Sequence, residues 1–197
     1  TSNTAYFLSF LCLVIPCAIL LNQPDVGQTI LLVLSWSAIV FVSGIKLIYI
    51  FCLFGVALSL IAILLFLFPI KFSYVFKRIE VFFDPSKGER FQSTKALDGI
   101  KEGGLKGQGM GEGTLKDKVP EAHTDYVISV IAEEFGSIIS IILICIFLYI
   151  AFRVIRFALQ SEDKFIKIAL CGLTSLLIFQ TFIHIGVNTS LLPTTGM

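Results

Sequence analysis

Apolar runs of membrane-spanning length alternate with polar segments along this chain. A helix needs about 20 predominantly apolar residues to cross roughly 30 Å of hydrocarbon. The runs are continuous and lack the period of two that is typical of a strand with one polar face. The pattern therefore predicts an all-α fold, a polytopic transmembrane helix bundle. The predicted helices cover residues 5–21, 27–45, 47–70, 127–157 and 164–187.

The composition supports a membrane protein. Mean hydropathy is +0.90, and residues 1–70 contain one acid, Asp25, and one base, Lys46. A soluble domain could not expose such a surface, whereas a bilayer can solvate it. The net charge of +1 gives no indication of nucleic acid binding, and we expect no such partner. The five cysteines lie inside the apolar runs without a CxxC motif, which predicts packing residues and neither a disulfide nor a zinc site.

One long polar segment, residues 71–125, separates the third and fourth predicted helices. A loop of this length is usually functional. Apolar positions within residues 90–104 predict a short interfacial helix that ends at Gly103 and Gly104. The loop holds ten Lys and Arg residues against five on the opposite side, yet the short basic connection at 153–167 favours the reverse orientation. Charge therefore leaves the side of the membrane open.

The ends of the chain indicate a piece of a larger bundle. The sequence starts at Thr1 without a methionine, opens almost directly into a helix, and stops after LLPTTGM. We interpret residues 1–197 as a single transmembrane domain fragment from the middle-to-late part of that bundle.

Asp25 is the first candidate functional residue, because ionisable groups at membrane level usually face protein or a water-filled cavity. It lies between two apolar runs, beside Pro24 and Gly27. The alternative is an N-cap for the helix that begins near Gly27, and the two roles can coexist.

The second candidate is the glycine-rich segment, residues 102–113, with six glycines in twelve residues. Such a segment can approach a ligand closely and point N–H groups at phosphate. It has neither the GK[ST] of a P-loop nor a surrounding strand–helix unit, so a plain flexible loop remains the alternative. Lys106 and Lys116 favour an anionic ligand.

The third candidate is the stretch VPEAHTDYVISVIAEEFG, which gathers Glu121, His123 and Asp125 before a helix that runs into the membrane. The helix dipole favours negative charge at this N-terminus. An ionised carboxylate near cations and a lipid interface suits a general base for a sugar hydroxyl beside a lipid-linked phosphate; capping with solvated neighbours is the alternative. Glu133 and Glu134 are expected to face the bundle interior. His184 predicts a hydrogen-bonded interhelical contact.

Several motifs in a fixed order resemble the SEDS (FtsW/RodA/SpoVE) family of membrane proteins, the polytopic peptidoglycan polymerases. The alanine in PEAHTD is similar to the division members of that family. Departures occur at Gln28, Leu115 and His184, and none touches the central acid. The motifs are QPDVGQ, RIEVFFDP, FQSTKAL, GGLKGQGMGEGTLK, VPEAHTDYVISVIAEEFG and FQTFIHIGVNTSLLPTTGM.

The resemblance implies a ten-helix bundle of which this chain holds roughly helices five to nine, with residues 71–125 outside a bacterial cytoplasmic membrane. Asp125 matches the essential loop aspartate of the family. The implied reaction polymerises lipid II: an acceptor hydroxyl attacks the anomeric carbon of the growing chain, and undecaprenyl diphosphate leaves with inversion.

The resemblance also implies substrate contacts and partners. Positive charge for the leaving diphosphate would come from Arg78, Lys106, Lys116 or a divalent cation, Mg²⁺ or Mn²⁺, and no organic cofactor is expected. Gln92, in the FQSTKAL motif, is a further candidate substrate-binding residue, together with Asp25, Glu121 and His123. The expected partners are a class B penicillin-binding protein transpeptidase, other division proteins and the lipid bilayer.

Two other functions remain open. In a lipid II transporter, Asp25, Glu133 and Glu134 would line a path for the headgroup, although the chain shows no internal repeat. A non-catalytic scaffold of the division machinery would need no acid at Asp125.

Overall fold

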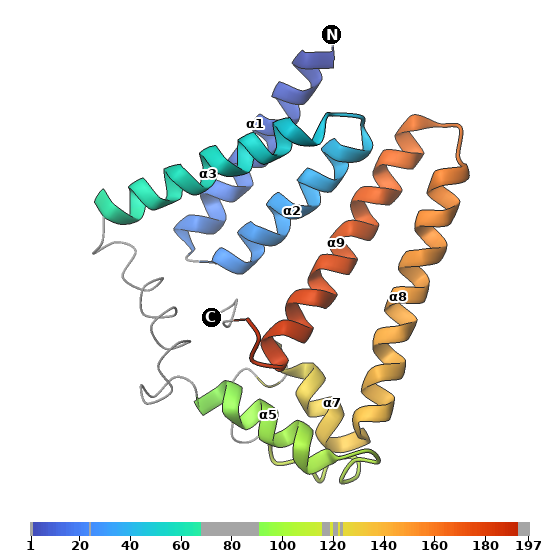
Figure 1. The fold of residues 1–197 in the computed structure, drawn as a ribbon. Helices are drawn as coiled ribbons and strands as arrows, with labels where there is room; N and C mark the ends of the chain where they lie inside the picture. Colours follow the sequence, from blue (N-terminus) through green and yellow to red (C-terminus); the bar gives the residue numbers. More distant parts are fainter. Residues whose placement is uncertain are drawn as a thin grey trace. The chain divides into compact units, whose positions relative to one another are not determined.

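The computed structural model describes residues 2–23, 25–67, 91–115, 119, 122 and 124–192. The described residues form helices and no strand, which confirms the all-α prediction (Figure 1). The helices are α1 (Ser2–Asn22), α2 (Val26–Val42), α3 (Leu47–Leu67), α5 (Phe91–Gly103), α7 (Val127–Phe135), α8 (Ser137–Gln160) and α9 (Lys164–Asn188).

Three of the described helices are long and apolar enough to cross a membrane: α1 from Thr4, α8 and α9. Their outward side chains are large and apolar, as at Phe7 on α1, Phe152 on α8 and Phe165 on α9, each at least 60% exposed. Exposing so much apolar surface to water is unfavourable, whereas the hydrocarbon of a bilayer solvates it. The exposed apolar surface therefore fits helices that face lipid.

The contacts divide the chain into two compact units. The first holds Thr1–Arg78 and Val154–Leu176, and the second holds Ile79–Arg153 and Leu177–Met197. Helices α8 and α9 run through both units, so the predicted single transmembrane domain stays a prediction. Asp25, the N-cap of α2, lies in the first unit, and Asp125 lies in the second.

In the first unit, α1 packs against α2, and the contacts include a hydrogen bond and a contact between two aromatic rings. The indole of Trp36 donates to Ser9 Oγ at 3.4 Å, and its ring lies 5.9 Å from that of Phe10. Tyr6 on α1 donates to the carbonyl of Ser43 at 3.4 Å. Helix α2 ends at Val42, three residues before its predicted end, and Gly44 follows with a φ of 100°, which does not continue a helix.

In the second unit, α5 packs against α7. The short helix predicted within the polar loop is confirmed, and it ends at Gly103, followed by Gly104 with a φ of 55°. Its predicted position at the membrane interface stays a prediction.

The prediction of one continuous helix over 127–157 is wrong, because the chain breaks at Gly136 into α7 and α8. Gly136 adopts a φ of 88°, and a Cβ atom there would overlap with the carbonyl of Leu105. Ser137 then turns toward α5: its N–H and hydroxyl both donate to the carbonyl of Gly104, at 2.9 and 2.7 Å. The break lets the loop after α5 cross the helix at close range.

Candidate active site

Asp125 lies in the turn directly before α7 and is half-buried. Its backbone carbonyl accepts a hydrogen bond from the side-chain amide of Asn188 on α9, at 2.7 Å. The next residue, Tyr126, is completely buried. Asp125 is therefore partly accessible, while Asn188 and the buried Tyr126 hold its backbone. The N-terminal end of α7 beside it favours negative charge.

The amide of Asn188 joins α9 to the start of α7 through four hydrogen bonds. Its Nδ2 donates to the carbonyls of Asp125 and His184 at 2.7 and 2.8 Å. Its Oδ1 accepts from the N–H and the hydroxyl of Ser129 at 2.9 and 2.7 Å. Asn188 and Ser129 are both fully buried. Every donor and acceptor of the amide therefore has a partner.

This arrangement changes how the N-terminus of α7 is capped. Capping was the alternative role for the acidic stretch before this helix, but Tyr126 occupies the N-cap position and makes no side-chain cap bond. The N–H of Ser129, in the first turn, is instead capped by Asn188, 59 residues further along the chain. The cap of α7 is thus a tertiary contact, and it has no local sequence signature.

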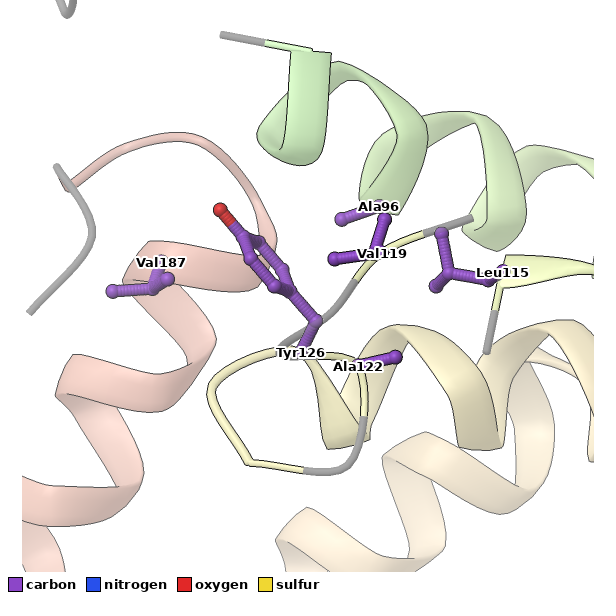
Figure 2. Packing of buried hydrophobic residues seen from close by; sticks show 6 residues of the cluster. All are labelled: Ala96, Leu115, Val119, Ala122, Tyr126 and Val187. Atoms are coloured by element: carbon purple, nitrogen blue, oxygen red, sulfur yellow. The ribbon is translucent and has the colours of Figure 1, made fainter. Parts of the chain in front are cut away.

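A cluster of buried apolar residues surrounds the chain that leads to Asp125 (Figure 2). The tyrosine ring lies between Val187 of α9 and the segment that carries Val119 and Ala122. Ala96 of α5 closes the cluster, together with Leu115. The cluster therefore packs α5, α9 and the approach to α7 together around the backbone of the candidate base.

The glycine-rich segment packs against the C-terminal half of α7. The N–H groups of Gln108 and Gly109 donate to the carbonyls of Glu133 and Glu134, at 2.9 and 3.0 Å. These two N–H groups, which the sequence suggested for phosphate binding, are therefore bonded to α7. This stretch of the segment is therefore hydrogen-bonded to the last turn of α7, whose carbonyls have no partner within the helix.

Close backbone approach accounts for glycine at two positions of the segment. A Cβ atom on Gly103 would overlap with the carbonyl of Ala132, and one on Gly107 would overlap with the carbonyl of Glu134. Gly107 also has a φ of 81°, which favours glycine. The glycines thus allow a loop and a helix to touch backbone to backbone.

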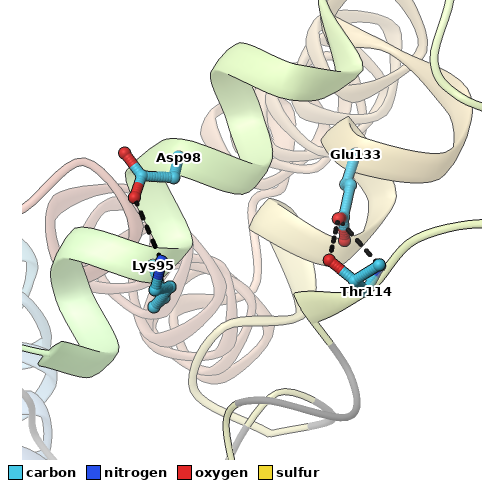
Figure 3. A network of polar contacts seen from close by, with 4 residues as sticks. All are labelled: Lys95, Asp98, Thr114 and Glu133. Atoms are coloured by element: carbon cyan, nitrogen blue, oxygen red, sulfur yellow. Dashed lines mark hydrogen bonds and ion pairs between the residues drawn. The ribbon is translucent and has the colours of Figure 1, made fainter.

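Glu133 fixes the end of this segment (Figure 3). Glu133 is 1% exposed, and its carboxylate accepts the N–H of Thr114 at 2.9 Å and the N–H of Leu115 at 3.0 Å. Glu133 is buried, but against the loop; the expectation that Glu133 and Glu134 face the bundle interior stays a prediction. Nearby on α5, Lys95 and Asp98 form a surface ion pair at 3.7 Å, which contributes little to stability.

The structure places only some of the predicted site residues. Lys106 is exposed, next to Gly107, at the end of α7 opposite Asp125, and the axis of a nine-residue helix separates those ends by about 12 Å. Gln92 belongs to α5, but its side chain lies outside the described residues. The remaining predicted residues of the loop also lie outside them: Arg78, Lys116, Glu121 and His123.

Asp25 caps α2, as one of the two interpretations of the sequence expected. Its carboxylate accepts the N–H of Gln28 at 3.0 Å, and its carbonyl accepts the hydroxyl of Thr29 at 2.8 Å. A contribution of Asp25 to the site of Asp125 stays a prediction.

An apolar cavity of about 320 Å³ lies between α7, α8 and α9, with Ile131 and Phe147 in its wall. Its polar side chains include Gln180 and His184, whose Nε2 atoms lie 2.9 Å apart. This bond joins residues one turn apart in α9, so the predicted interhelical hydrogen bond of His184 stays a prediction. The cavity could accept hydrocarbon beside the first turn of α7.

The described part of the chain contains no group of three His, Cys, Asp or Glu side chains that could hold a metal ion. Glu121 and His123, the polar neighbours of Asp125 in sequence, lie outside that part. The divalent cation therefore stays a prediction.

The profile of the cell cycle protein family FtsW/RodA/SpoVE matches residues 1–197. The chain belongs to this family. It is a multi-pass membrane protein. This agrees with the resemblance seen in the sequence motifs.

The chain is similar to proteins named probable peptidoglycan glycosyltransferase FtsW. The relative from Caulobacter vibrioides is 40% identical over 190 residues, 96% of this chain and 48% of its own length. The relative from Francisella salina is 37% identical over 186 residues, 91% of this chain and 45% of its own length. The chain thus spans about half the length of these curated relatives.

A solved structure shares the fold. It comes from work described as "Structural coordination of polymerization and crosslinking by a peptidoglycan synthase complex", and the match has a TM-score of 0.70 at 23% identity. It covers 98% of this chain and 53% of that one. The chain therefore shares its helical fold with that structure.

Sequence reasoning missed Asn188, which holds the backbone of Asp125, and Ser129, which bonds to the same amide. Asn188 and Ser129 are small polar residues in apolar helices, and such residues often bond between helices. That signal marks Asn188 as a tertiary contact, but it does not name the partner. The bonded carbonyl of Asp125 is 63 residues away.

Proposed function

We propose that the full-length protein is a peptidoglycan glycosyltransferase that polymerises lipid II during cell division, with Asp125 as its general base. The observation that carries the proposal is the half-buried Asp125 at the N-terminal end of α7, on a backbone tethered to α9. The names of the relatives supply the reaction class. A positioned carboxylate at a membrane surface is the group that an inverting displacement needs.

In the proposed step, the 4-hydroxyl of the acceptor GlcNAc attacks the anomeric carbon of the growing chain. The hydroxyl proton moves to the carboxylate of Asp125 as the new C–O bond forms. The bond to the diphosphate breaks at the same carbon, and undecaprenyl diphosphate leaves with the electron pair. Attack from the opposite face inverts the anomeric configuration, and one base is sufficient for this displacement.

The leaving diphosphate develops negative charge that cations must balance. Lys106 is exposed and free to turn toward a headgroup, and Arg78 and Lys116 are the other proposed sources. A divalent cation, Mg²⁺ or Mn²⁺, would supply the same charge. The apolar cavity beside α7 supports a substrate with a hydrocarbon chain.

We place the protein in the bacterial cytoplasmic membrane, with residues 71–125 on the outer face where the acceptor glycan grows. A class B penicillin-binding protein transpeptidase is the proposed partner, with other division proteins. The description of the solved structure, which joins polymerization to crosslinking in one complex, supports such a pairing.

Polymerisation of purified lipid II by the full-length protein tests the proposal. Asp125→Asn keeps the shape of the side chain and removes the base, so we expect a loss of about 10²- to 10⁴-fold. Asp98→Asn is the matched control, because it removes a carboxylate from a surface ion pair of the same unit. Near-normal glycan synthesis by folded Asp125→Asn would refute the base assignment, and no glycan synthesis by the folded parent protein would favour a lipid II transporter or a scaffold.

A further inference from the structure

We infer that Asn188 is a positioning residue that sets the place of the Asp125 carboxylate, and this inference rests on the proposed function. Asn188 is 0% exposed, and its amide makes four hydrogen bonds of 2.7 to 2.9 Å. Two donors and two acceptor positions are all that an amide has, so the group is completely used. No capacity of this side chain is left for a substrate.

Three of the four bonds reach the candidate base and the helix that follows it. Two hold Ser129 in the first turn of α7, and one holds the carbonyl of Asp125 itself. The fourth returns to the carbonyl of His184 and fixes the rotamer of Asn188 on its own helix. Asn188 thereby ties the backbone that carries the carboxylate to α9.

The tether matters because it holds the backbone from which the Asp125 carboxylate projects. Tyr126 makes no side-chain cap bond, so the α9 amide replaces the local cap of α7. A general base must lie within hydrogen-bond reach of the proton that it takes. Misplacement by about 1 Å can cost about 10²-fold in rate. Loss of Asn188 should therefore lower kcat through Asp125, without changing the groups that bind substrate.

Three variants of the full-length protein separate this role from simple stabilisation. Asn188→Leu keeps the volume and removes all four bonds. Ser129→Ala removes one bond and keeps the amide on the Asp125 carbonyl. Thr174→Val is the matched control, because it removes a buried hydroxyl of the same helix that donates to the carbonyl of Leu170, four residues earlier in α9.

For lipid II polymerisation, we expect Asn188→Leu to lower kcat by about 10²-fold with KM nearly unchanged. Ser129→Ala should lower kcat less, and Thr174→Val should leave both parameters near those of the parent. In the Asp125→Asn background, Asn188→Leu should add no further loss, since a positioning residue acts through the group that it positions. A full further loss in that background, or equal losses in Asn188→Leu and Thr174→Val, would overturn the inference.

Hydrogen exchange gives a second readout that needs no activity. In Asn188→Leu, the amides of residues 126–129 should exchange at least about tenfold faster, because the capped N–H of Ser129 loses its acceptor. Unchanged exchange there would refute the tether, even if polymerisation falls. The proposed function fails separately, when Asp125→Asn retains activity while exchange in Asn188→Leu still rises.

Discussion

The Glu133 carboxylate offers a measurable test of how the loop after α5 is held. Glu133→Ala leaves the N–H groups of Thr114 and Leu115 without their acceptor. The buried N–H of Leu115 then costs about 1–3 kcal/mol, and the part-buried N–H of Thr114 costs less because water can reach it. The hydroxyl of Thr114, at 3.5 Å, is too distant to add much. Relief from no longer burying a carboxylate offsets part of this cost. We expect a net destabilisation of about 2 kcal/mol.

Glu133→Gln refines the test because it keeps the shape. One amide oxygen can accept one N–H, but the NH₂ group then faces the second donor, so about half of the loss should remain. Thermal unfolding in detergent measures the global effect, and hydrogen exchange at residues 107–115 measures the local one. Glu102→Gln, on the exposed surface of α5, is the control. If exchange at Thr114 and Leu115 is the same in Glu133→Ala and in the Glu102 control, the Glu133 carboxylate does not hold this part of the loop.

Two further paired substitutions test the packing and the caps. Gly107→Ala should destabilise the protein clearly more than Gly104→Ala in thermal unfolding, because both have a positive φ but only Gly107 faces a carbonyl, that of Glu134, within overlap distance; equal losses would show that backbone strain alone matters. Asp25→Asn should keep the cap on Gln28, and Asp25→Ala should lose about 1 kcal/mol. We expect both Asp25 variants to lose glycan synthesis, and full activity in Asp25→Asn would identify the residue as a cap only.

The helices and their approximate ends could be predicted from the sequence because their signals are local. Apolar runs of membrane length predicted α1, α2, α3 and α9, and glycines at positions 103 and 104 predicted the end of α5. Asp25 is a cap whose partner lies three residues away, so it too was readable. The family and the candidate base followed from motifs in a fixed order, and the family profile confirms the family.

The tertiary structure alone decided what holds the candidate site. The amide of Asn188 finds the Asp125 carbonyl 63 residues away, and the carboxylate of Glu133 finds the N–H of Thr114 at a separation of 19. A lone polar residue in an apolar helix shows that it needs a partner, since burial without one is costly, but it does not show which partner. The break at Gly136 has the same origin: glycine permits a positive φ anywhere, and only the approach of the Leu105 carbonyl requires it here.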